Sequence, residues 1–600
     1  MAVDWSTEWY TSTFWIIGVF AGTVLGCAIV LRLVVRYTLW GRQFSRLVFP
    51  YFSPRGPEGR EPLVTLLLVL LLTITSVRIT VLVSYVNNGL FTSLQQLDPA
   101  AFLRSVLIFA VLATVSVVVV LLAYYVQQRL VIRTRAWLTH RIVGDWLDGG
   151  AYHRNRFTRA PVDNPDQRIQ EDIDNFTEYS GTLGIGAVRS LVSLASFTVV
   201  LWSLSGPLTV FGVEIPRAMT FFAYIYVIVA TVIAFRIGHP LIRLNFVRER
   251  FNASFRYALV RLRDNSENVA FHRGEPVERA TLGARFSAVI GNAWAIVYRN
   301  LRFLGFNLVI TQGAEVVPYV IQAPRFFAGQ VTLGDVQQTA IAFSQVHDSL
   351  SFFRNAYDEF ASYRAMLIRL TGLLDADQEA RELPRVAIEE GEGLAVRDLT
   401  VRMPDDRVLV DDLELQLAAG ASLFVTGPSG SGKTTLLRSL ADLWPYADGT
   451  VHRPLGDDAL FLSQQPYLPL GTLRTALAYP GPASGVDDER AIAMLRRVQL
   501  LHLADRLDEE MDWARRLSPG EQQRLGFGRV LLARPRVVFL DEATSALDEG
   551  LEHTLYTLLR EELPETIVVS VGHRSTLNRF HAERLELLGD GRWQVATLSH

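Results

Sequence analysis

Five long apolar stretches constrain the fold of this chain more than any other feature of its sequence. Each has roughly the 20 residues that a helix needs to cross the hydrocarbon core of a bilayer. Half of all residues are hydrophobic, which is high for a water-soluble protein. The predicted spans are 14–35, 63–83, 102–126, 183–203 and 221–237.

Two weaker candidate spans follow at 293–320 and 331–353. They contain amides and one carboxylate, namely Gln312, Glu315, Gln337, Gln338 and Gln345. Polar groups at membrane depth are costly unless they face a bundle interior or a wet cavity. We therefore count seven predicted spans and take Gln312 and Glu315 as candidates for lining a cavity. The alternative is that this stretch lies near the membrane surface.

Arginine-rich and arginine-poor connections alternate between the predicted spans. Along the chain, connections with five, eight and nine arginines alternate with connections that have none or one. Arginine-rich loops stay in the cytoplasm, so the N-terminus is predicted to lie outside and the chain beyond the seventh span inside. The rich connections are 36–60, 127–181 and 238–293, and the poor ones are 84–101, 204–220 and 322–330.

The two longest cytoplasmic connections are predicted to continue the spans as helices at 133–147 and 242–263. Polar segments at 164–174 and 264–274 offer charged and amide groups for contact with a cytoplasmic domain, with solvated loops as the alternative. The acidic stretch 371–392, which holds a proline, is predicted to be a linker.

The chain has a single cysteine, Cys27, which excludes disulfide frameworks and cysteine-based metal sites. Because it lies in an apolar run, Cys27 is predicted to be a small buried hydrophobe. Residues 1–13 carry two acids and no base, so no cleavable secretory signal is expected.

Lys433 is the only lysine of the chain, and it lies in a glycine-rich motif. A compact ammonium on a flexible stem reaches phosphate oxygens better than a planar guanidinium does. An apolar strand is predicted at 421–425 and a helix from Thr434, which is the order that a phosphate loop requires. Backbone N–H groups would hold the phosphates, and the Thr434 hydroxyl would ligate Mg²⁺. The predicted nucleotide-binding residues here are Gly427, Pro428, Ser429, Gly430, Ser431, Gly432, Lys433, Thr434 and Thr435.

Carboxylates and an amide follow two short apolar strands downstream. Gln464 comes after the first strand, where its amide can ligate Mg²⁺. Asp541 and Glu542 end the second strand, so Asp541 would hold Mg²⁺ and Glu542 would polarise an attacking water.

Three further motifs complete the series. Ser518 and Gly520 open a helix, whose positive end suits an anion. Asp548 follows the paired carboxylates, and His573 comes after a strand predicted at 566–571. Alone, His573 would be taken for a structural histidine, but the ordered set favours a functional one.

This ordered set resembles that of the ATP-binding cassette (ABC) ATPases and covers about residues 393–600. The resemblance implies ATP and Mg²⁺ as cofactors, with ATP on Lys433 of one subunit closed by Ser518 and Gly520 of a second. It also implies that His573 contacts the γ-phosphate. The predicted catalytic residues are Glu542, His573, Gln464 and Lys433; Asp548 joins the nucleotide site; and the metal ligands are Thr434, Gln464 and Asp541.

Two positions depart from the pattern of that family. Met403 stands where many such ATPases carry an aromatic residue that stacks on adenine, so stacking is weak or supplied elsewhere. Pro519 replaces a glycine of the signature motif, which removes one N–H but suits the first turn of a helix.

Strings at 163–169, 252–275 and 353–357 look like those of one branch of the family. They are similar to subfamily D half-transporters, the peroxisomal fatty-acyl-CoA type, and to bacterial BacA/SbmA-like permeases fused to an ATPase. The resemblance implies the six-helix fold of ABC exporters with an extra N-terminal span, and coupling roles for the two cytoplasmic loops. Bacterial members are linked to uptake of cobalamin, bleomycin and antimicrobial peptides.

The sequence thus predicts an all-α transmembrane domain followed by an α/β P-loop ATPase domain. The expected function is ATP-driven transport of a bulky hydrophilic solute by a homodimer in a bacterial plasma membrane, with import as the expected direction. An exporter or acyl-CoA transporter and a membrane-tethered sensor or scaffold are the alternatives; no nucleic-acid partner is expected. The predicted segments are 1–60 (extra span and connection), 61–370 (transmembrane domain), 371–392 (linker) and 393–600 (ATPase domain).

Overall fold

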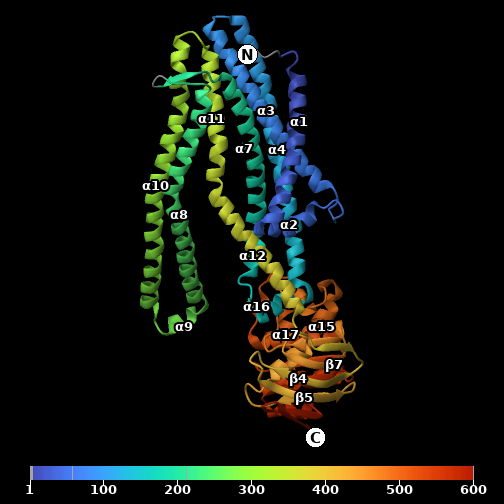
Figure 1. Cartoon of the computed structure of the whole chain (residues 1–600). Coiled ribbons are helices and arrows are strands. Elements are labelled where there is room, and N and C mark those ends of the chain that lie inside the picture. The colour runs from blue at the N-terminus through green and yellow to red at the C-terminus, as the bar shows by residue number, and fades with distance from the viewer. Residues whose placement is uncertain (1–4, 57, 211–212, 599–600) are drawn as a thin grey trace. The chain divides into compact units, whose positions relative to one another are not determined.

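A computed structural model describes residues 5–56, 58–210 and 213–598, and the chain divides into two compact units (Figure 1). Unit 1 comprises residues 1–145 and 163–375, and unit 2 comprises residues 146–162 and 376–600. The first four residues of the predicted segment 1–60 lie outside the described residues.

Unit 1 is built almost wholly from long helices, with one small hairpin of β1 (Leu208–Val210) and β2 (Val213–Ile215). Six described helices are long and apolar enough to cross a membrane. They confirm the apolar helices expected for six of the seven predicted spans. These helices are α1 (Glu8–Tyr37), α3 (Glu61–Gln95), α4 (Pro99–Leu147), α7 (Ile173–Leu204), α8 (Ala218–Asp264) and α10 (Glu275–Phe327).

The seventh predicted span forms α11 (Leu333–Asn355), which is not apolar enough to be identified as a span by composition. It packs against α3, α7, α8 and α10. Gln338 is buried there and accepts a hydrogen bond of 2.7 Å from the Asn88 amide of α3. Because other helices surround α11, its polar side chains need partners rather than an apolar environment. That α11 crosses the membrane stays a prediction.

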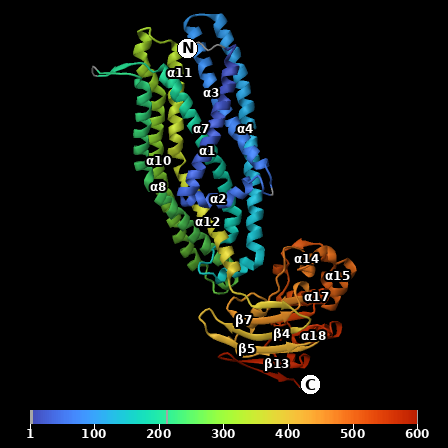
Figure 2. The same ribbon diagram turned by 45° about the vertical axis from the view of Figure 1, so that its right-hand side comes forward.

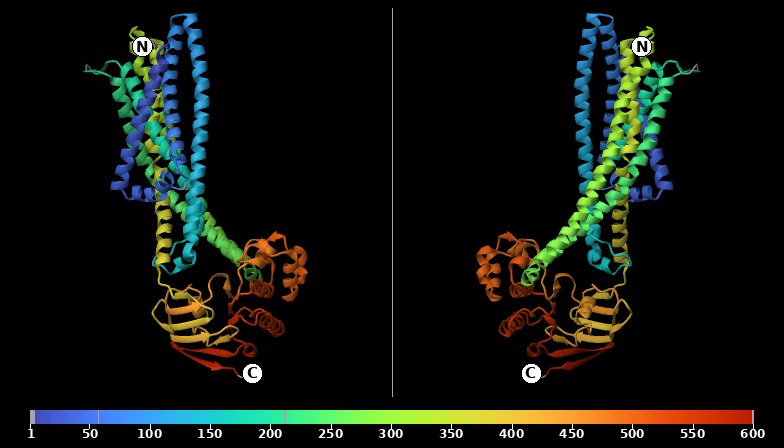
Figure 3. Two further views of the ribbon diagram at one scale, coloured as in Figure 1. Left: turned by 90° about the vertical axis from the view of Figure 1, so that its right-hand side faces the viewer. Right: turned by 90° about the vertical axis from the view of Figure 1, so that its left-hand side faces the viewer.

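Two helices of unit 1 continue well beyond the length of a span. As predicted, α4 runs on through 133–147 and α8 through 242–263. The short helix α9 (Ser266–Phe271) joins α8 to α10, which pack against each other along their length (Figure 1). Figure 3 shows α3 and α4 running in opposite directions on either side of the short turn at 96–98.

The remaining helices of unit 1 are shorter. Helix α2 (Leu39–Phe52) follows α1, and the hydroxyl of Thr38 caps its first turn by accepting a hydrogen bond from the Gly41 N–H at 3.1 Å. Helix α6 (Pro165–Gln167) precedes α7, and α12 (Tyr357–Glu382) follows α11. The predicted linker 371–392 is therefore helical over its first half, where buried Leu373 and Leu374 give α12 an apolar face.

Unit 2 includes a segment from far upstream, residues 146–162 with the helix α5 (Ala151–Arg154). Contact with a cytoplasmic domain stays a prediction for 164–174 and 264–274, which both belong to unit 1. The segment grouped with unit 2 lies just before the first of these stretches. The reason is side-chain chemistry. Buried Arg154 and half-buried Phe157 find carbonyl and aromatic partners in unit 2, whereas Asp172 forms its ion pair with Arg369 inside unit 1.

Two sheets and several helices form the rest of unit 2 (Figure 2). A four-stranded sheet has the order β3-β7-β4-β5, with strands at Ala387–Glu390, Ala447–Arg453, Leu394–Arg402 and Val408–Leu417. A six-stranded sheet has the order β14-β13-β6-β12-β11-β8, with strands at Arg592–Thr597, Glu583–Gly589, Ser422–Thr426, Ile567–Val571, Val537–Asp541 and Ala459–Leu462. A third, small pair joins β9 (Gly471–Thr472) and β10 (Glu510–Met511). The helices are α13 (Lys433–Leu440), α14 (Leu473–Ala478), α15 (Asp488–Arg497), α16 (Trp513–Arg516), α17 (Pro519–Ala533) and α18 (Glu549–Glu562).

Strand burial explains why the larger sheet lies at the centre of unit 2. All residues of β12 are buried, as are the first four of β11 and of β6. Continuous apolar runs of this kind are typical of parallel strands covered on both faces. Figure 2 shows the helices α14, α15, α17 and α18 gathered in one part of unit 2, away from the strands β4, β5 and β7. This rigid core holds the ends of the parallel strands in place.

Candidate nucleotide site

Four neighbouring parallel strands deliver the predicted site residues to one edge of the six-stranded sheet. Strand β12 pairs in parallel with β6 on one side and with β11 on the other, and β11 pairs in parallel with β8. The phosphate loop (427–433) follows β6, Glu542 follows β11, His573 follows β12 and Gln464 follows β8. Because parallel strands end at the same edge, motifs more than 100 residues apart converge there.

Backbone conformation explains the glycines of the phosphate loop. Gly427, Gly430 and Gly432 have φ values of 144°, 80° and 99°, which L side chains rarely adopt. A Cβ atom on Gly427 would also lie 2.5 Å from the Leu587 carbonyl oxygen. The loop can therefore turn tightly onto the N-terminus of α13 only with glycine at these positions.

Lys433 is buried at the first position of α13 and donates hydrogen bonds from its ammonium to the carbonyl oxygens of Gly427 and Pro428, both at 2.9 Å. The ammonium is thus hydrogen-bonded to the backbone of its own phosphate loop. Next to it, the buried Ser431 hydroxyl has no hydrogen-bond partner among the described residues. A cation and an unsatisfied donor in one cradle fit a phosphate chain, which would supply the missing acceptors.

The predicted metal ligands also come together. The Thr434 hydroxyl donates a hydrogen bond to the Asp541 carboxylate at 3.2 Å, which joins the start of α13 to the end of β11. A hydroxyl and a carboxylate at this separation are oxygen ligands suited to Mg²⁺. Gln464, the third predicted ligand, is exposed after β8, the strand next to β11.

Two charged groups at this edge of the sheet are shielded from water, because Lys433 is buried and Asp541 is half-buried. Burial raises the pKa of Asp541, the Thr434 hydrogen bond opposes the rise, and the Glu542 carboxylate adds to it. Burial lowers the pKa of Lys433, and the carboxylates of Glu542 and Asp541 oppose that change. A partner of opposite charge would therefore stabilise the ionised form of either group more strongly here than in bulk water.

Glu542 and His573 face each other across two adjacent strand ends. The Glu542 carboxylate lies 3.2 Å from His573 Nε2, and the Glu542 N–H donates to the Val571 carbonyl at 3.0 Å. Glu542 has a φ of 51°, a left-handed conformation uncommon for a non-glycine residue. Such backbone outliers cluster at functional sites, where the surrounding structure enforces them.

The predicted signature residues lie at the start of α17. Ser518 caps that helix, and its hydroxyl donates to the Glu521 carboxylate at 2.8 Å. Pro519 occupies the first helical position, as its missing N–H favours. No hydrogen bond or ion pair between described residues joins Ser518 or Gly520 to the phosphate loop of the same chain.

The predicted site residue Asp548 caps α18, where its carboxylate accepts a hydrogen bond from the Leu551 N–H at 2.8 Å. Arg574, directly after His573, donates to the Leu547 carbonyl at 2.8 Å and approaches the buried Glu552 carboxylate at 3.5 Å. The segment before Asp548 is thereby tied to the strand end that carries His573. Sequence reasoning missed Arg574 and Glu552 because an isolated arginine or glutamate carries no spacing signal.

Gln523 is a second site residue that sequence reasoning missed. Its buried amide donates to the Gln464 carbonyl oxygen at 2.9 Å and to the Ser545 hydroxyl at 3.1 Å, and it accepts from the Ala546 N–H at 2.9 Å. One side chain of α17 therefore fixes two of the predicted motifs. In the sequence, only the adjacent pair Gln522 and Gln523 in the signature stretch points to this bridging role.

Met403, which stands where an aromatic residue was expected, has an apolar environment. It is half-buried and packs against the apolar cluster beneath the four-stranded sheet, as does Phe157. The Phe157 ring lies edge-on to Trp444 at 5.2 Å and to Tyr446 at 6.1 Å between centroids. The segment 146–162 is thus anchored by an aromatic side chain in unit 2.

Arg154 provides the polar half of that anchor and is 1% exposed. Its guanidinium donates to the carbonyl oxygens of Ala380, Leu383 and Pro384 at 3.1, 2.9 and 2.7 Å. It also donates to the Asp442 carbonyl at 3.3 Å, just beyond the C-terminus of α13. The segment 146–162 therefore contacts the helix that begins with Lys433.

Two family models match the chain. The model described as ABC transporter transmembrane region 2 matches residues 56–327, and the model described as ABC transporter matches residues 410–545. The first covers the helices of unit 1 from α3 to α10, and the second covers the phosphate loop through the paired carboxylates. Fused membrane and ATPase domains in one chain are therefore confirmed.

Full-length relatives agree with this division. An uncharacterized ABC transporter ATP-binding protein from Haemophilus influenzae is 44% identical over 99% of this chain and 100% of its own length. The inner membrane ABC transporter ATP-binding protein YddA from Escherichia coli is 31% identical over 88% of this chain and 94% of its own length. The human lysosomal cobalamin transporter ABCD4 is 30% identical over 76% of this chain and 80% of its own length.

Proposed function

Since this chain belongs to the ABC transporter family, as a half-transporter related to subfamily D, we propose that it moves a bulky hydrophilic solute inward as a homodimer. It is a multi-pass inner-membrane protein whose C-terminal ATPase domain binds ATP and couples hydrolysis to transport. The observation that carries the proposal is the convergence of Lys433, Thr434, Asp541, Glu542 and His573 at one sheet edge.

The proposed roles follow from that geometry. The phosphate loop N–H groups and Lys433 would bind the phosphates, and the Ser431 hydroxyl would gain the acceptor that it lacks. Thr434, Asp541 and Gln464 would hold Mg²⁺, which neutralises phosphate charge when bound. Glu542 would orient and polarise the attacking water, with His573 at 3.2 Å as its partner and as a contact for the terminal phosphate.

Incompleteness of the single chain supports a dimer. Ser518 and Gly520 begin α17 and have no polar contact with the phosphate loop of their own chain among the described residues. A helix N-terminus with an exposed hydroxyl is well suited to the terminal phosphate of a nucleotide held by another subunit. A second copy of the same chain supplies that motif most simply.

Two observations support the proposed cargo. One relative is named a cobalamin transporter, and cobalamin is a bulky hydrophilic solute. Gln312 and Glu315 are exposed on α10 in the single chain, so they are available to line a passage between two copies. An exporter, a fatty-acyl-CoA transporter and a membrane-tethered sensor remain the competing functions.

Transport in proteoliposomes tests the proposal. Vesicles are loaded with labelled cobalamin, and ATP is added outside so that only ATPase domains facing outward are active. An importer in this orientation empties the vesicles, and Glu542→Gln should not. ATP-dependent filling would make the protein an exporter, and hydrolysis without movement of cobalamin, peptides or acyl-CoA would favour the sensor.

A further inference from the structure

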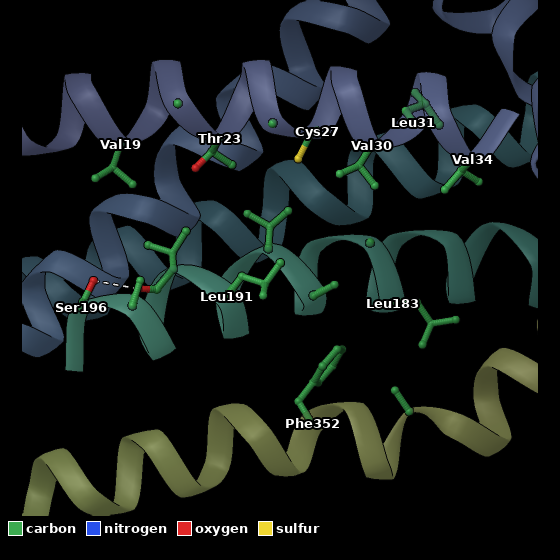
Figure 4. Close-up of a pocket in the computed structure, with 18 of the residues that line it drawn as sticks. Val19, Thr23, Cys27, Val30, Leu31, Val34, Leu183, Leu191, Ser196 and Phe352 are labelled. Atoms are coloured by element: carbon green, nitrogen blue, oxygen red, sulfur yellow. Dashed lines mark hydrogen bonds between the residues drawn. The ribbon is translucent and has the colours of Figure 1, made fainter. Parts of the chain in front are cut away.

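A large cavity among the described residues of unit 1 lies between α1 and neighbouring helices. Its volume is about 1320 Å³. Its walls come from α1, α2, α3, α7, α11 and α12. Figure 4 shows Val19, Cys27 and Val34 of α1 pointing toward Leu183 and Leu191 of α7, with Phe352 on the far side. Cys27, predicted to be buried, is exposed because it faces this cavity.

The cavity separates α1 from the helices behind it. Helix α1 has no buried residue over its 30 residues. Near its start, Arg78 of α3 pairs with the Glu8 carboxylate and donates to the Ser12 hydroxyl at 3.0 Å. Just beyond its end, Trp40 of α2 packs edge-on against Phe360 of α12, with ring centroids 5.4 Å apart. Helix α1 is therefore held near both ends, and between them the cavity separates it from α7.

The walls are mostly apolar, and their one charged side chain among the described residues, Arg78, is paired with Glu8. The Ser180 hydroxyl donates to the Phe176 carbonyl and the Ser196 hydroxyl donates to the Val192 carbonyl, both at 2.7 Å. The Ser180 hydroxyl also lies 3.2 Å from the Tyr363 hydroxyl of α12. Water needs two to four polar partners in a buried site, and this wall offers few. A hydrophilic solute would be excluded for the same reason. An apolar wall of this kind favours hydrocarbon as the content.

The length and ends of the cavity match a bilayer. From Trp15 to Val34, α1 lines the cavity over roughly 28 Å at 1.5 Å per residue, close to the ~30 Å thickness of a hydrocarbon core. Trp15 and Tyr85 lie toward one end, and Trp40 lies toward the other. Aromatic residues of this kind mark the two membrane interfaces. The volume exceeds the ~300–1,000 Å³ of a usual small-molecule site.

We propose that this cavity is a lipid-binding site, in which the acyl chains of a bilayer phospholipid fill the space between α1 and the bundle formed by α3, α7, α11 and α12. The lipid packs α1 against the bundle, because hydrocarbon supplies the contacts that the helices do not make with each other. The site is separate from the nucleotide site and does not depend on the identity of the cargo.

Photocrosslinking tests the site on the full-length protein in vesicles of phosphatidylethanolamine and phosphatidylglycerol. A trace of phosphatidylethanolamine carries a diazirine in its acyl chain, and cross-linked peptides are mapped after irradiation. We expect labelling of α7 around Leu183 and Leu191, which face the cavity. Labelling confined to outward residues of α1 such as Phe14 and Leu25 would overturn the proposal.

Glycines provide matched variants. Added Cβ atoms at Gly22, Gly26 and Gly184, which line the cavity, would meet no atom within 4 Å, and the same holds for Gly18, which does not line it. G22L/G26L and G184L should each reduce cross-linking to α7 several-fold, whereas G18L should leave it unchanged. Equal labelling in all variants, with ATPase activity retained, would contradict the site.

The single cysteine identifies a competing occupant. If a second copy covered this face of α1 instead of lipid, a bismaleimide would link Cys27 of the two copies efficiently. We expect no such product in vesicles, because Cys27 faces α7 of its own chain. Efficient Cys27–Cys27 cross-linking would replace the lipid by a subunit interface.

Discussion

The nucleotide site and the apolar cavity are assembled in opposite ways. The nucleotide site is made of short contiguous motifs whose donors and acceptors are fixed by strand ends, with Thr434 bonded to Asp541 and Glu542 beside His573. The cavity is lined by residues scattered over six helices, and the two serine hydroxyls that line it bond within their own helix. Phosphate needs directed hydrogen bonds, whereas hydrocarbon needs only space and the absence of unsatisfied polar groups. A motif search therefore finds the first kind of site and overlooks the second.

The sharpest test of the directed site is Glu542→Gln. Loss of the carboxylate should reduce ATP turnover by roughly 10²–10⁴-fold, while nucleotide binding persists and an ATP-bound dimer accumulates. Steady-state phosphate release and gel filtration with ATP measure the two effects. Glu561→Gln, on the exposed surface of α18, is the control. Normal turnover by the Glu542 variant would remove this residue from the mechanism.

Lys433→Ala should have the next largest effect, at the binding step. Without the ammonium that lies across the phosphate loop, affinity for ATP should fall below detection in a fluorescent-nucleotide titration. Tight ATP binding by this variant would refute the assignment of the loop. Neither variant should change acyl-chain labelling of α7, which keeps the two kinds of site experimentally separate.

Arg154→Ala probes whether 146–162 is an integral part of unit 2. Removing the guanidinium leaves the carbonyls of Ala380, Leu383 and Pro384 without this donor. The loss at buried Ala380 should cost about 1–3 kcal/mol. The midpoint for thermal inactivation of ATPase activity should fall by several degrees. Arg156→Ala removes an exposed arginine two residues away and should change it little. Equal shifts would show that burial of Arg154 does not matter.

The smallest effect on catalysis is expected for Glu315→Ala. If Glu315 lines a passage, transport should fall while basal ATP hydrolysis stays normal. Glu275→Ala, in the first turn of the same helix, is the matched control. Unchanged transport of every cargo tested would show that Glu315 serves no passage. The polar residues that serve function would then all lie in unit 2.

Much of the architecture could be predicted because its signals are local. Hydrophobic length indicated six of the long helices, and the strand-loop-helix order indicated the phosphate loop. The polar residues of 331–353 made this span harder to predict, because a helix packed inside a bundle can be either polar or apolar. The anchoring of 146–162 in unit 2 by Arg154 and Phe157 could not be predicted, because no periodicity marks an arginine that binds carbonyl oxygens.

The sequence by itself determined the two kinds of domain, their order, the family and the residues that end the parallel strands, because each rests on nearest neighbours along the chain. Only the tertiary structure decided that Gln523 bridges two motifs, that Arg154 belongs with unit 2, and that Cys27 faces a cavity. These features join residues tens to hundreds of positions apart. They depend on which surfaces pack together and where packing leaves a space, and spacing along one chain does not encode either.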